Sequence, residues 1–98
     1  MKTVSARLNW LRPDEGGLQA PPSGSRYVTV SRFEQQHDTW HKEEWSMVVE
    51  FIEPPDAVLM QRVNVRFLVE AAPHHLLVSG NRFELLEGER VVATGVIL

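Results

Sequence analysis

The sequence predicts an all-β domain, a small closed antiparallel barrel of six strands. Apolar residues recur at every second position in successive short segments, which is the period of a half-buried strand. Turn-forming residues separate these segments, and no stretch has a convincing helical period of 3.6 residues. Six short strands must hide their edges, and closure into a barrel does so. The prolines all fall between the expected strands: Pro13, Pro21, Pro22, Pro54, Pro55 and Pro73.

Each strand is predicted from its own pattern. The first four strands are expected at 4–11, 26–33, 45–53 and 61–71. Alternation is cleanest in the fourth, where the side chains expected to point inward are Val63, Val65, Phe67 and Val69. The segment 81–98 is typical of a hairpin that turns near Glu87, Gly88 and Glu89. Its second arm, Val91 to Leu98, is apolar on both sides, as in a central strand or one at an oligomer contact.

Ten residues are expected to line the barrel because each has an inward position in this period of two: Val4, Leu8, Trp10, Val49, Phe51, Val63, Val65, Phe67, Phe83 and Leu85. The one helix candidate is 38–45, with Asp38 as a possible N-cap. We expect a loop or a single helical turn there. Trp10 and Trp45 are expected in the core, whereas Trp40 is either a clamp for its loop or an interface anchor.

Composition narrows the class of protein. The 98 residues are 43% hydrophobic and carry a net charge of −3, which indicates a single soluble domain spanning 1–98. A dedicated nucleic-acid binder usually has a basic excess, so we expect no DNA partner and at most weak RNA binding. The absence of cysteine excludes disulfides and thiolate chemistry and fits a reducing compartment. With no signal-like or membrane-spanning apolar block, a cytoplasmic location is expected.

The connection after the first strand carries a family resemblance. "SARLNWLRPDEGGLQAPPSGSRY" resembles the opening of the third, carboxy-terminal β-barrel domain of translation elongation factor Tu. The family's acidic tetrad is matched by Asp14, Glu15, Gly16 and Gly17, and the loop's Gly-Tyr-Arg-Pro ending is matched in part by Gly24 and Arg26. The final segment is also similar, and its matching residues are Arg82, Phe83, Glu87, Gly88, Arg90, Val91, Gly95 and Val96. The resemblance thus covers nearly the whole chain.

In that family the barrel contacts the T-stem of aminoacyl-tRNA and protein partners. The resemblance implies that Arg66, Glu87 and Gly88 occupy positions near the tRNA backbone. However, Leu18 and Gln19 stand where the family has Arg-His, and this replacement removes cations that attract phosphate. We therefore expect no tight binding of aminoacyl-tRNA.

The same loop is the expected partner surface. The residues expected to contact a partner, preferably a protein, are Asp14, Glu15, Gly16, Gly17, Leu18, Gln19, Pro21, Pro22, Arg26, Arg66, Glu87, Gly88 and Arg90. An exposed leucine beside two prolines suits a protein interface. The alternative is that the loop only covers one open end of the barrel. Gly16 and Gly17 are both expected to allow positive φ where the chain leaves the strand.

Two further clusters could carry function. His37 and His41 would share one face of a helix and could hold a metal with a carboxylate, although a solvated polar loop is favoured there. Arg62, Asn64 and Arg66, together with Arg82 and Arg90, form either a basic face or an ordinary solvated strand face. No phosphate-binding loop motif is present, so we expect no nucleotide hydrolysis, no enzyme activity, no cofactor and no structural metal.

Three hypotheses follow. The first and favoured one is a non-catalytic binding module built on this barrel. It would meet a protein or RNA partner, one from the translation machinery being the candidate that the resemblance suggests. The second is a structural or regulatory interaction protein that associates with itself. The third is a small metal-dependent enzyme at His37 and His41.

Overall fold

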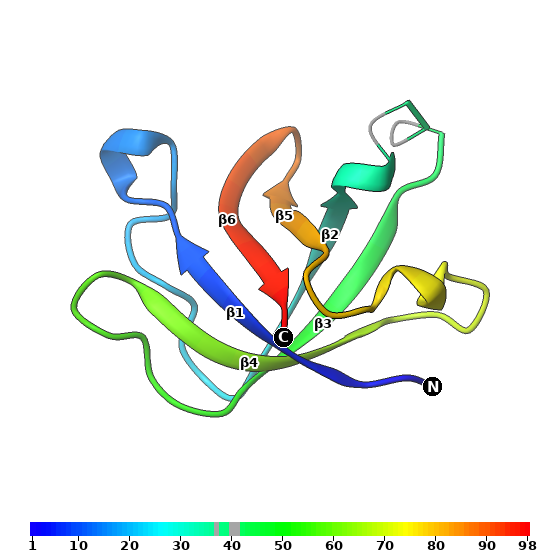
Figure 1. Ribbon diagram of the computed structural model, residues 1–98. Coiled ribbons are helices and arrows are strands. Elements are labelled where there is room, and N and C mark those ends of the chain that lie inside the picture. The colour runs from blue at the N-terminus through cyan, green and yellow to red at the C-terminus, as the bar shows by residue number, and fades with distance from the viewer. Residues whose placement is uncertain (37, 40–41) are drawn as a thin grey trace.

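The computed structural model of the chain is a closed barrel of six antiparallel strands, which confirms the predicted fold class (Figure 1). The structure describes residues 1–36, 38–39 and 42–98. The strands are β1 (Val4–Trp10), β2 (Arg26–Phe33), β3 (Trp45–Phe51), β4 (Met60–Phe67), β5 (Arg82–Glu87) and β6 (Arg90–Ile97). In the described part of the chain, three single-turn 3-10 helices lie between them: η1 (Pro13–Glu15), η2 (Glu34–Gln36) and η3 (His74–Leu76).

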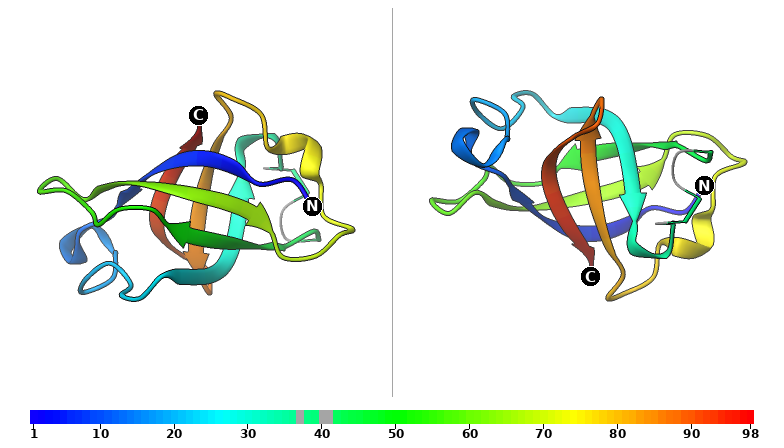
Figure 2. Two further views of the ribbon diagram at one scale, coloured as in Figure 1. Left: turned by 90° about the horizontal axis from the view of Figure 1, so that it is seen from below. Right: turned by 90° about the horizontal axis from the view of Figure 1, so that it is seen from above.

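Around the barrel the strands run in the order β1-β4-β3-β2-β5-β6, and β6 then pairs with β1 (Figure 2). Because all neighbours are antiparallel, the connections gather at two ends. The turn end carries the segments 11–25 and 52–59 and the two-residue turn between β5 and β6. The terminal end carries the β2–β3 connection, the segment 68–81 and both chain termini.

The interior follows the predicted alternation. Eight of the ten residues expected to line the barrel are buried, and the other two, Val4 and Phe51, pack partly buried against the same core. Three phenylalanines fill the terminal half. The ring of Phe33 lies 5.8 Å from that of Phe67 and 5.2 Å from that of Phe83, measured between centroids. Trp10 is buried and Trp45 packs against the core, as predicted.

The fourth strand ends earlier than predicted. β4 stops at Phe67, which pairs with Met47 near the start of β3. Beyond Phe67 the ladder continues only as one bond, from the Leu68 amide to the Ser46 carbonyl at 2.9 Å. The prediction that Val69 points inward is therefore wrong, and its side chain is 45% exposed. Ala72, Leu76 and Leu77 close that end of the core instead.

The segment 38–45 contains no described α-helix: Asp38 and Thr39 form a turn, and β3 already begins at Trp45. His37, Trp40 and His41 lie outside the described residues. The metal site proposed at the two histidines and the role of Trp40 therefore stay predictions.

Candidate functional site

Most of the predicted partner surface comes together at the turn end of the barrel. The segment 11–25 begins beside β6, since the Leu11 amide donates to the Val92 carbonyl at 3.0 Å. At its other end, the Tyr27 hydroxyl donates a hydrogen bond to the Glu87 carboxylate. The loop and the turn between β5 and β6 therefore share one rim. The predicted residues exposed there are Asp14, Glu15, Gly16, Gln19, Arg26, Glu87, Gly88 and Arg90, while Pro21 and Pro22 are partly buried.

The two glycines of the loop serve different purposes. Gly16 has φ of 93°, as predicted, and ends η1. Gly17 does not have positive φ, which corrects the sequence prediction. It is buried, and a Cβ there would lie 2.1 Å from the Leu11 carbonyl oxygen. Gly17 is therefore required because the backbone of the loop doubles back against the end of β1.

Leu18 is not an exposed anchor. Its side chain is partly buried and packs against the barrel core, which corrects the expectation that it is exposed. Trp10, Tyr27 and Phe51 form the aromatic floor at this end: Trp10 lies 5.8 Å from Tyr27 and 6.4 Å from Phe51, ring centroid to centroid. Leu18 thus packs the loop against the core as a cover would, and the expectation that the exposed loop residues contact a partner stays a prediction.

The Leu18→Asp variant is therefore expected to lose stability rather than only partner binding. Placing a carboxylate against a partly buried apolar surface should cost about 1–3 kcal/mol of unfolding free energy. Urea denaturation followed by tryptophan fluorescence measures the change. Gln19→Asp is the matched control, because Gln19 is the exposed neighbour and receives the same charge. Equal denaturation midpoints for the two variants would show that Leu18 does not belong to the core.

The environment of Tyr27 shifts its pKa clearly from the ordinary value. Burial and then the hydrogen bond to Glu87 raise the pKa of Tyr27 to about 12. Both causes favour the protonated phenol, because the phenolate would lose hydration and face a carboxylate.

Since Tyr27 is the only tyrosine of the chain, ultraviolet absorbance should report its titration directly, with a midpoint near pH 12. The folded-state pKa exceeds the unfolded value of 10.0, so the stability that Tyr27 contributes is complete below pH 10 and is lost as the pH rises toward 12. Glu87→Gln should lower the pKa of Tyr27, whereas Glu89→Gln should not. A phenol that titrates near pH 10 in the folded protein would contradict this environment.

Arg66 is the predicted site residue that the structure places elsewhere. It lies near the terminal end of β4, opposite Val48 in the ladder, while the loop and the hairpin turn lie at the turn end. Its Nε atom is 4.0 Å from an oxygen of Glu50 on β3. The predicted site is therefore divided, and Arg66 contributes to a different part of the surface.

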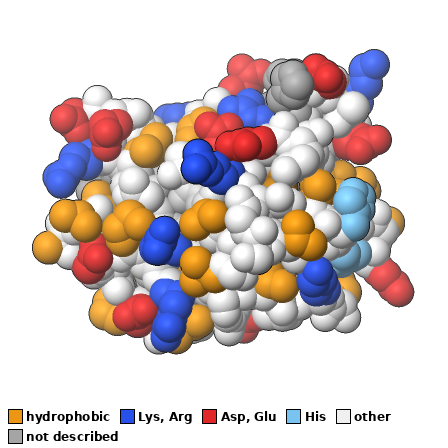
Figure 3. Space-filling view, viewed as in Figure 1, with side chains coloured by type: hydrophobic (Ala, Val, Ile, Leu, Met, Phe, Trp, Pro, Cys, Tyr) orange, Lys and Arg blue, Asp and Glu red, His pale blue; other side chains and the backbone are white. Residues whose placement is uncertain are grey.

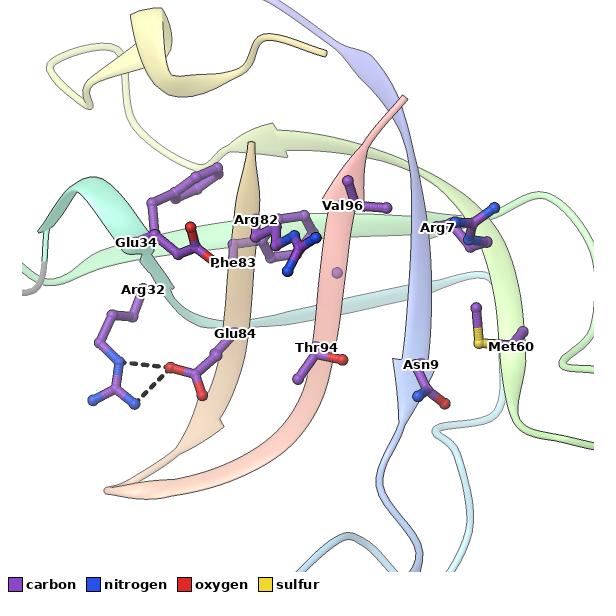
Figure 4. A pocket seen from close by; sticks show the side chains of 12 residues that line it. Arg7, Asn9, Arg32, Glu34, Met60, Arg82, Phe83, Glu84, Thr94 and Val96 are labelled. Atoms are coloured by element: carbon purple, nitrogen blue, oxygen red, sulfur yellow. Dashed lines mark hydrogen bonds and ion pairs between the residues drawn. The ribbon is translucent and has the colours of Figure 1, made fainter. Parts of the chain in front are cut away.

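A hollow lies on the outer face of the barrel, apart from the rim residues of the turn end and from Arg66. It has a volume of about 860 Å³ and is centred on β6 and its two neighbours, β1 and β5 (Figure 4). The residues that line it are Arg7, Asn9, Arg32, Phe33, Glu34, Met60, Arg82, Phe83, Glu84, Thr94, Gly95 and Val96.

The outward side chains at the centre of the hollow are short. Thr94 and Val96 of β6 point outward, while Gly95 between them faces the core ring of Phe83. The neighbouring strands present long side chains on both sides: Arg82 and Glu84 on β5, and Arg7 and Asn9 on β1 (Figure 4). A trough between two raised walls results, with β6 as its floor.

The charges of the trough are only partly balanced. Arg32 donates to one oxygen of Glu84 from Nη2 at 2.6 Å and from Nε at 2.9 Å. Among the residues that the structure describes, no ion pair joins Arg7 or Arg82 to a carboxylate. In Figure 3 basic side chains run down the middle of this face, and acidic ones lie mostly along its upper rim.

The arginines for which the sequence left open a basic face or a solvated strand face do not all lie together. Arg82 lines the trough and Arg62 lies beside it, opposite Arg7, whereas Arg66 and Arg90 lie apart from it. Sequence reasoning gave Arg7 no role, because its neighbours follow only from the pairing of the first strand with the fourth and the last.

The described residues contain no group of three His, Asp or Glu side chains arranged to hold a metal ion. Within the same part of the chain, no helix is long and apolar enough to cross a membrane. No protein-family model matches the sequence, and a search of curated proteins finds no significant relative.

Proposed function

We propose that this protein is a non-catalytic binding module whose barrel presents the outer trough over β6 to a partner, preferably a protein. The observation that carries the proposal is the trough itself: a hollow of about 860 Å³ lined by two arginines without a carboxylate partner among the described residues. Exposed guanidinium groups beside an apolar floor are typical of protein interfaces, where arginine is enriched.

The barrel also suits a module of this kind mechanically. Each strand is paired on both sides, so the backbone that carries the trough is held by ladders from β5 and β1 at once. Side chains on a rigid sheet present a surface whose shape changes little when a partner binds. The sequence resemblance to the third barrel of elongation factor Tu supports the same class of function, since that domain is itself a non-catalytic contact surface. We propose descent from such a domain, with the partner site moved to the trough.

The proposal is tested by filling the trough. Thr94→Trp places an indole on its floor, at an exposed strand position that tolerates an aromatic residue. Val28→Trp is the matched control, because Val28 is 41% exposed and points outward from β2, outside the trough. Affinity capture from lysate of the native host should lose the partner with Thr94→Trp and retain it with Val28→Trp. Unchanged capture by Thr94→Trp would rule out the trough as the partner site.

A further inference from the structure

Three arginines lie in one row across four strands. In the ladder, Arg82 of β5 is paired with Val96 of β6, and Val96 is paired with Arg7 of β1. Arg7 is in turn paired with Arg62 of β4. All four side chains point outward. Arg7, Arg62 and Val96 each stand between two buried residues of their strand. Arg82 is the first residue of β5, and the residue after it, Phe83, is buried. The row therefore reads Arg82, Val96, Arg7 and Arg62 across the outer face.

The spacing of this row follows from the sheet. Neighbouring strands lie about 4.8 Å apart, so the backbones at Arg7 and Arg62 are about 5 Å apart and those at Arg7 and Arg82 about 10 Å apart. Like charges directly opposite in an antiparallel pair destabilise it. Arg62 has a partial counter-charge, since its Nε lies 3.5 Å from a Glu53 oxygen, but Arg7 and Arg82 have none among the described carboxylates. The fold alone gives no reason for this arrangement.

Acidic side chains flank the row on both sides. Glu34 and Glu84 line the trough beyond Arg82, and Glu84 is already bound to Arg32. Beyond Arg7, a smaller hollow shares Arg7 and Met60 with the trough and includes Glu53 and Asp56. Arg82 and Arg7 thus lie between two groups of carboxylates, in which Glu84 is paired with Arg32 and Glu53 with Arg62.

From this pattern we propose that the trough binds an acidic segment of a partner protein, with carboxylates placed on Arg82 and Arg7. The inference rests on the proposed function and adds the chemistry of the partner. Carboxylates on alternate residues of an extended peptide lie about 7 Å apart, whereas the backbones at Arg7 and Arg82 are about 10 Å apart. The long arginine and glutamate side chains span the difference. The Val96 side chain between the two arginines offers an apolar contact for the intervening residue.

A nucleic-acid strand fits the same row less well. Its phosphates continue beyond the arginines at every nucleotide, so they would meet Glu34 and Glu84 at one side or Glu53 and Asp56 at the other. The chain as a whole also carries a charge of −3, which disfavours a long polyanion. A protein segment can place neutral or basic residues opposite these carboxylates.

The test is a fluorescence anisotropy titration at low salt. The probe is a labelled octapeptide of alternating glutamate and valine, and its glutamine–valine counterpart is the uncharged reference. Arg7→Gln and Arg82→Gln should each weaken binding of the acidic peptide about fivefold, the upper end for an exposed ion pair, and the double variant about 20-fold. Arg26→Gln is the matched control, because Arg26 is an exposed strand arginine outside the trough and should bind like the parent protein.

Melting curves recorded alongside establish that every variant is folded. The inference is overturned if Arg7→Gln and Arg82→Gln bind the acidic peptide as the parent does, if Arg26→Gln weakens binding equally, or if a labelled RNA octanucleotide binds more tightly than the peptide. These outcomes differ from failure of the proposed function, in which Thr94→Trp retains the cellular partner. Loss of that partner with Thr94→Trp, together with unaffected arginine variants, would reject only the acidic chemistry.

Discussion

Phe33→Ala is expected to lose about 3–5 kcal/mol of unfolding free energy. The Phe33 ring is 1% exposed and lies between the rings of Phe67 and Phe83, so its removal leaves a cavity at the centre of the terminal half. A domain of this size has a total stability of about 5–15 kcal/mol, so this loss would leave a marginal fold. Urea denaturation followed by circular dichroism measures it.

Val28→Ala is the control for this prediction. Val28 lies on the same strand but points to the outer face and is 41% exposed, so its truncation should change stability by less than about 1 kcal/mol. Similar losses for the two variants would mean that β2 does not alternate between core and solvent as described.

Gly95→Val is expected to destabilise the fold by about 3 kcal/mol, at the upper end for overpacking a core. Gly95 is buried in β6 and paired with Phe83 on one side and Leu8 on the other. A Cβ at this position would lie 2.3 Å from Cζ of the Phe83 ring. That ring cannot easily withdraw, because it packs against Phe33.

A double-variant cycle checks the cause of this loss. Phe83→Leu in the Gly95→Val background removes the atoms that clash, so the double variant should be clearly more stable than the sum of the two single losses predicts. Additive losses would show that Gly95 is needed for another reason. The result also concerns the trough, because Gly95 forms part of its lining.

Most of the fold could be predicted from the sequence because strands that are half buried carry their own signal. The period of two identified all six strands and ten core positions, and the prolines marked the connections. The prediction was wrong at Val69, where apolar residues continue beyond the end of β4 at Phe67. Alternation reports which residues are apolar, and it does not report where the pairing of a strand with its neighbours ends.

The loop after β1 shows a second limit. The sequence predicted positive φ at Gly16, where the chain leaves the strand, and the structure agrees. It could not show that Leu18 folds back onto the core, because an apolar residue in a loop suits a cover and an interface equally well. Gly17 was likewise predicted to have positive φ. A glycine is needed there for a different reason, because a Cβ would lie too close to the Leu11 carbonyl oxygen.

The candidate site was the least accessible to sequence reasoning. The three arginines of the row lie at positions 7, 62 and 82, and only closure of the barrel aligns them. Arg62 and Arg82 were considered together as parts of a basic face, but Arg7 required the register of β1 against both of its neighbours. The resemblance to the elongation factor barrel directed attention to the rim loop, and it remains a prediction about ancestry.

Site-directed photo-cross-linking tests the central claim most directly. The chain has no cysteine, so Thr94→Cys and Ser23→Cys each create one attachment point for a benzophenone maleimide, the first in the trough and the second on the exposed rim loop. With partner captured from the native host, irradiation should yield a cross-linked protein product from Thr94→Cys and little from Ser23→Cys. Cross-linking from Ser23→Cys alone would contradict the account and return the partner site to the loop.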